Sequence, residues 1–167
     1  PKKAPWGCEP FDYESIVQPV LDRHCVRCHS GKNRKTGLDF TAAKVASGNQ
    51  GLFNRSYRTI LGESLLGTGK DSRVTLSDRF SDSSVTKAKA FGSHASTFIA
   101  HLKKGHKDVK LSRDDWYALV TWVDFNCVYH GRLINKYPSD GAPARRERFS
   151  WADPWACGEL PAVSDRE

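Results

Sequence analysis

The stretch DYESIVQPVLDRHCVRCH, residues 12–29, decides how the rest of the chain can be interpreted. Its apolar side chains recur at helical spacing, which predicts a helix from Asp12 to His24 with Asp12 as its N-terminal cap. The apolar face of this helix consists of Ile16, Val17, Val20 and Leu21. Because Pro19 cannot donate a backbone hydrogen bond, we expect either a kink there or regular helix only after it.

The next segment, C-x-x-C-H at residues 25–29, is typical of covalent haem attachment. Two cysteines on one helical turn present their sulfurs on the same side, where they can add to the two vinyl groups of a haem. A redox dithiol or half of a zinc site would be the alternatives, but no strand pattern precedes Cys25 and no second C-x-x-C or H-x-x-x-H occurs. The sequence therefore predicts one covalent haem c at Cys25 and Cys28, with His29 as the proximal iron ligand.

The composition suits a single globular domain of 167 residues. The apolar runs are far shorter than the ~20 residues that cross a bilayer, so we expect no membrane span. The sequence contains no Met, which removes the thioether that many haems use as a second axial ligand. Without an initiator Met, the chain is expected to be a processed protein or a domain of a longer one.

The net charge is +7, and the pI is near 9.3. Basic residues are spread along the chain without interleaved aromatic side chains, which favours an acidic protein partner over nucleic acid. One group of basic residues surrounds the loop at residues 105–112. It could form a docking face for an acidic redox partner, or it could be only a solvated helix end. This group consists of Lys103, Lys104, Lys107, Lys110 and Arg113.

Five cysteines are present, and three remain if two hold a haem. We expect one disulfide among Cys8, Cys127 and Cys157, without a choice of pair. Thioether haem attachment and a persistent disulfide both require an oxidising compartment, so the expected location is periplasmic or otherwise extracytoplasmic.

Three further helices are predicted, over residues 52–61, 93–104 and, after a capping box at Ser112 to Asp115, 112–127. Residues 31–92 hold eight glycines, which indicates loops and short helices, and 62–92 remain unassigned. Residues 131–167 are rich in Pro, Gly, Arg and Trp. The expected organisation is a haem domain over 1–130 and an irregular extension over 131–167 packed on the same domain.

This order of elements resembles the class I cytochrome c fold, in which a helix ends in C-x-x-C-H and a C-terminal aromatic-rich helix crosses it. The resemblance covers residues 11–127 and implies a mainly α structure with long loops. In that fold the second iron ligand comes from the loop before the C-terminal helix. Here that loop is GHKDVKLS, residues 105–112, with His106 in the place that Met usually takes.

A narrower resemblance rests on the phrases FDYESIVQPVLDRHCVRCHSG, GSHAS, KKGHKDVKLS and WVDFNCVYHG. They are similar to the cytochrome c domains of planctomycete proteins, among them the haem domains of the hydrazine synthase alpha subunit. One of those domains has two histidine ligands. Another uses a Tyr four residues after the motif histidine, where this chain has Asn33. The resemblance therefore implies the bis-histidine type.

The candidates for the distal position are His106, His94, one of the remaining histidines, or an open or water-bound iron. His106 leads because of its place in the loop, whereas His94 starts a predicted helix and also suits a capping role. We expect His24, His101 and His130 to serve on the surface or in packing. Four aromatic residues could pack on a haem, although ordinary core filling is the alternative for each: Tyr57, Phe91, Trp116 and Trp122.

The predicted function is one-electron transfer to or from a carrier or a larger parent enzyme, because two imidazoles leave no position on iron for a substrate. A haem enzyme or small-ligand site with an open sixth position is the alternative, so enzymatic activity is undecided and is the less favoured outcome.

Overall fold

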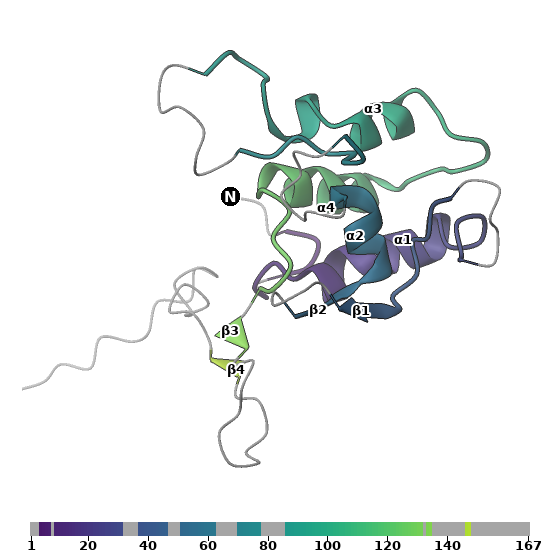
Figure 1. The fold of residues 1–167 in the computed structure, drawn as a ribbon. Helices are drawn as coiled ribbons and strands as arrows, with labels where there is room; N and C mark the ends of the chain where they lie inside the picture. Colours follow the sequence, from purple (N-terminus) through teal and green to yellow (C-terminus); the bar gives the residue numbers. More distant parts are fainter. Residues whose placement is uncertain are drawn as a thin grey trace, which may run out of the picture.

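The computed structural model describes residues 4–7, 9–31, 37–46, 51–62, 70–77 and 86–131, with the backbone of 133–134 and 146–147 (Figure 1). Helices make up most of the regular structure in these residues, which agrees with the mainly α prediction. Among the described residues, no helix is long and apolar enough to span a membrane.

The predicted first helix is present but divided. A π-helical turn, η1, covers Tyr13–Val17, and the α-helix α1 covers Gln18–His24. Asp12 caps η1 by accepting hydrogen bonds from the backbone N–H groups of Glu14 and Ser15. Pro19 lies in the first turn of α1, where its missing N–H is tolerated. Regular α-helix is therefore confined to the part around and after this proline, as the sequence predicts.

A small hairpin and a short helix follow. Strand β1 (Lys44–Ala46) pairs antiparallel with β2 (Leu52–Asn54), and α2 covers Arg55–Leu61. The prediction of helix from residue 52 is wrong for its first three residues, because Leu52 to Asn54 pair with β1 instead. Gly62 ends α2 at a φ of 83°, a left-handed conformation that favours glycine.

The predicted helix over 93–104 is also shorter. A 3₁₀ turn, η3, covers Gly92–His94, and α3 covers Thr97–Lys103. Ser96 has extended backbone angles and caps α3 through a hydrogen bond from the Ile99 N–H group at 3.2 Å. The η3 turn and the α3 helix are separate because the extended backbone of the Ser96 cap interrupts the helical conformation between them.

The last helix, α4, covers Arg113–Asp124 and begins with the predicted capping box between Ser112 and Asp115. It ends before Cys127, because Asn126 and Cys127 have positive φ values of 58° and 54°. In Figure 1, α4 lies between α3 and the η1–α1 segment.

The buried core lies between η1, α1, α2 and α4. Its centre is an aromatic cluster of Tyr13, Tyr57, Trp122 and Tyr129, whose neighbouring rings lie 4.8 to 6.1 Å apart. The hydroxyl group of Tyr13 donates to Ser56 Oγ at 2.8 Å, and that of Tyr129 donates to Asn54 Oδ1 at 2.9 Å. These buried polar groups therefore have partners.

Residues 129–131 return to the start of the domain. The Tyr13 N–H group donates to the Tyr129 carbonyl at 3.0 Å, and the Gly131 N–H group donates to Asp12 Oδ2 at 3.1 Å. A Cβ atom on residue 131 would lie 2.6 Å from the carbonyl oxygen of Phe11, so this close approach requires glycine.

Two predicted regions are described only in part. Residues 70–77 and 86–91 contain no helix or strand, although Val74 and Leu76 are buried. After Gly131 the backbone forms two short strands, β3 (Leu133–Ile134) and β4 (Arg146–Glu147), which pair antiparallel. The predicted packing of the 131–167 extension on the domain otherwise lies outside the described residues.

Candidate functional site

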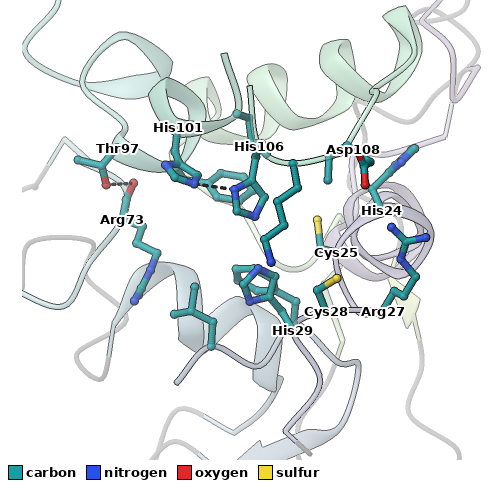
Figure 2. A pocket seen from close by; sticks show the side chains of 16 residues that line it. His24, Cys25, Arg27, Cys28, His29, Arg73, Thr97, His101, His106 and Asp108 are labelled. Carbon is teal, nitrogen blue, oxygen red and sulfur yellow. Dashed lines mark hydrogen bonds between the residues drawn. The ribbon is translucent and has the colours of Figure 1, made fainter. Parts of the chain in front are cut away.

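A cavity of about 370 Å³ opens between the end of α1, α3 and the loop that joins α3 to α4 (Figure 2). Residues from four separate parts of the sequence, between His24 and Val109, meet in its wall. They are His24, Cys25, Arg27, Cys28, His29, Leu38, Phe40, Arg73, Thr97, Phe98, His101, Leu102, His106, Lys107, Asp108 and Val109.

The C-x-x-C-H segment forms one side of this cavity. The chain leaves α1 at Cys25 and turns tightly, with the Cys28 and His29 N–H groups donating to the Cys25 carbonyl at 3.1 and 2.9 Å. The sulfurs of Cys25 and Cys28 lie on the same side of the cavity (Figure 2). The His29 carbonyl accepts from the Phe40 N–H group at 2.8 Å, which ties the motif to the following segment.

His106 lies across the cavity from His29 (Figure 2). The ring centroids are 5.8 Å apart, and the ring planes differ by 25°. Imidazole nitrogens bind first-row metals at about 2 Å, so two imidazoles on opposite sides of one ion have centroids on the order of 6 Å apart. The observed spacing suits one metal ion between the two rings.

The local backbone explains how His106 reaches this position. Gly105 ends α3 with a φ of 91°, and Lys107 has a φ of 49°. The His106 carbonyl accepts from the Val109 N–H group at 3.1 Å, which closes a turn around the histidine. The Nδ1 atom of His106 lies 2.9 Å from Nε2 of His101, in the last turn of α3.

The surroundings favour the neutral form of both imidazoles. Burial lowers the pKa of His29, and repulsion from His106, Lys107 and His101 in their charged forms lowers it further. Burial also lowers the pKa of His106, with His101 and Lys107 as further causes. Neutral imidazole is the form that binds a metal.

Burial, with Cys28 close by, raises the pKa of Cys25 to about 11. Its side chain is therefore a protonated thiol at neutral pH.

Apolar side chains form much of the remaining wall: Leu38, Phe40, Phe98, Leu102 and Val109. The four aromatic residues that the sequence suggested for haem packing do not line the cavity. Trp122 and Tyr57 belong to the core, where Trp122 Nε1 donates to the Val128 carbonyl and the Tyr57 hydroxyl donates to the Cys127 carbonyl. For these two residues, ordinary core filling is what the structure shows.

No protein-family model, curated protein or solved structure matches this chain.

The remaining histidines differ in their surroundings. His94 is exposed in η3 and does not line the cavity. His130 is exposed, with its ring 4.7 Å from that of Tyr129. His101 is exposed as predicted, but it also lines the cavity and contacts His106, which the sequence prediction missed.

His24 links the cavity to α4 through Asp115. The carboxylate of Asp115 lies 3.0 Å from His24 Nε2, forms an ion pair with Arg23 and accepts from the Ser112 hydroxyl. Burial opposes ionisation of this carboxyl, but the hydrogen bonds from Ser112, Arg23 and His24 outweigh it and lower the pKa to about 2. Asp115 therefore holds the start of α4 against the residues that precede Cys25.

Replacing Asp115 with asparagine should destabilise the protein by about 1–2 kcal/mol at pH 7, because the charged hydrogen bonds are lost. The pKa of Asp115 is about 2 in the folded protein and ordinarily 3.8, so the carboxylate stabilises the fold above pH ~4. This stabilisation disappears as the pH falls towards 2. Denaturant unfolding of both proteins across this range measures the difference. Asp114→Asn, on the exposed face of the same turn, is the control, and a difference independent of pH would contradict the assignment.

The structure reduces the number of cysteine pairs that could form the predicted disulfide. Cys127 is a buried free thiol, and burial raises its pKa. Cys8 and Cys157 lie outside the described residues. If a disulfide forms, it should therefore join Cys8 to Cys157, with a stabilisation of roughly 3–5 kcal/mol for a long loop. Non-reducing mass spectrometry that finds Cys127 in a disulfide, or finds Cys8 and Cys157 both free, would contradict this.

Proposed function

We propose that this chain is a c-type cytochrome domain with one covalent haem c and bis-histidine ligation, and that it transfers single electrons. The observation that carries the proposal is the meeting of Cys25, Cys28, His29 and His106 around one cavity. His106 is 77 residues from His29 in sequence, so this meeting is a result of the fold and not of local spacing.

The residues fit a haem in three respects. The two thiols lie on one side, as attachment to two vinyl groups requires. The two imidazoles are separated by the distance that one iron ion needs. The wall around them is apolar in large part, as suits a macrocycle. When bound, haem c supplies an iron centre that changes oxidation state by one electron.

Two imidazoles in these positions would occupy both axial sites. His29 is held by the turn at Cys25 and by Phe40, and His106 by its own turn. With both histidines held in place, water would be excluded from a metal bound between them, and the two side chains would move little when that metal changes oxidation state. Because no Met thioether is present, we expect a lower reduction potential than that of a His/Met cytochrome.

The arrangement of elements supports a class I cytochrome c-like fold as part of the proposal. Helix α1 runs into the C-x-x-C-H segment, and α4 packs against η1, the turn that precedes α1. The distal histidine comes from the loop just before α4. Covalent haem attachment would place the protein in the periplasm or another extracytoplasmic compartment, where a disulfide would also persist.

We further propose an acidic redox partner, either a separate protein or part of a larger parent enzyme. All five cations around the distal loop are exposed, and Lys107 also lines the cavity. Electron exchange with an acidic partner protein should slow as salt screens this face. Lys103→Gln with Lys110→Gln should weaken that salt dependence, whereas Lys70→Gln with Lys87→Gln, exposed elsewhere, should not. Equal salt dependence in both pairs would contradict the docking face.

Optical and EPR spectra of the purified protein in both oxidation states test the proposed function. We expect a six-coordinate low-spin haem that stays on the chain after denaturation, with little carbon monoxide binding to the reduced form. A high-spin spectrum with rapid carbon monoxide binding would instead favour the haem enzyme or small-ligand site with an open sixth position.

A further inference from the structure

One contact in the cavity lies outside the predicted ligand set. The Nε2 atom of His101 and the Nδ1 atom of His106 are 2.9 Å apart, and the two ring centroids are 4.6 Å apart (Figure 2). His101 belongs to α3 and His106 to the loop after it, so a helix side chain contacts the loop side chain that faces His29.

We infer that His101 is a positioning residue for the distal ligand: it accepts a hydrogen bond from Nδ1–H of His106 and leaves Nε2 of His106 for iron. This inference rests on the proposed bis-histidine ligation.

The proton positions follow from the chemistry of imidazole. A neutral imidazole that binds a metal through one nitrogen carries its proton on the other. If Nε2 of His106 binds iron, Nδ1 bears hydrogen and must be the donor to His101. In this arrangement His101 is the acceptor through the lone pair of Nε2, and its own ring proton is on Nδ1.

Such a bond has two effects on the ligand. It fixes the rotation of the His106 ring about the bond to the metal, and it makes the ligating nitrogen more basic. A more basic ligand stabilises the oxidised iron more than the reduced iron. His101 should therefore lower the reduction potential and keep His106 bound after reduction.

The test compares His101→Phe, which cannot accept the bond, with His101→Gln, whose amide oxygen can. His101→Phe should remain low-spin when oxidised, but its reduction potential should rise. Because loss of such outer partners typically weakens metal–ligand affinity by about 10–100-fold, its reduced form should bind carbon monoxide about ten-fold faster or more. His101→Gln should recover part of both changes, and His94→Ala, exposed away from the cavity, should show neither.

The outcomes separate this inference from the proposed function. A low-spin His101→Phe protein with unchanged potential and carbon monoxide binding overturns it, as does a loss of thermal stability alone, which would indicate only a structural role. Binding of iron through Nδ1 of His106 would break the contact with His101 and give that same unchanged result. If the unmutated protein is high-spin, or if His106→Ala stays low-spin, then His106 is not the distal ligand. In that case the proposed ligation is wrong, and so is the role of His101 in positioning His106.

Discussion

Replacing both Cys25 and Cys28 with alanine should remove all covalent haem from the chain. The two sulfurs lie on one side of the cavity, and in the described residues the only other cysteine, Cys127, is buried in the core. No other described thiol can therefore substitute for them. Haem staining after denaturing electrophoresis should give a strong band for the unmutated protein and none for the double variant.

The single variants and Cys127→Ala provide the controls. Cys25→Ala and Cys28→Ala should each keep one thioether bond and therefore some stain, whereas Cys127→Ala should keep both bonds. If haem can be extracted from the unmutated protein with acidified organic solvent, covalent attachment is wrong. Full staining of the double variant would place the attachment elsewhere.

The second large effect is expected for His106→Ala, which should convert a low-spin haem into a high-spin one. His106 faces His29 at a centroid distance of 5.8 Å, and alanine has no group that could bind iron. The sixth position then opens to water and to added ligands. Optical spectra should show the change in spin state, and the reduced variant should bind carbon monoxide rapidly.

His94→Ala is the matched control, because His94 is the other histidine that the sequence offered as a distal ligand. It is exposed in η3 and does not line the cavity, so its loss should leave the spectrum low-spin. The reverse result, with His94→Ala high-spin and His106→Ala low-spin, would transfer the ligand role to His94.

The sequence predicts the parts of this structure that local chemistry determines. Asp12, Pro19 and the capping box at Ser112 act on their own neighbours in the chain, and all three have the predicted roles. The strands of the hairpin were missed because each has only three residues, too few for a visible alternation. Their pairing displaces the start of α2.

The cavity, too, has parts that depend on local sequence and parts that depend on long-range contacts. The positions of Cys25, Cys28 and His29 follow from one turn of chain, whereas the walls depend on contacts between distant segments. Phe40 joins the site through its hydrogen bond to the His29 carbonyl, which no spacing reveals. His101 could have been noticed, since Gly105 turns the chain back between it and His106.

Residues 129–131 have a mechanical consequence for the domain. Their hydrogen bonds to Asp12 and Tyr13 bring the two ends of the helical core, the start of η1 and the segment after α4, to one place. A unit with adjacent ends can be inserted into a loop of another protein without stretching it. The cavity lies at the far end of α1, and none of these joined residues lines it, so the segments attached at this junction can change without altering the cavity wall.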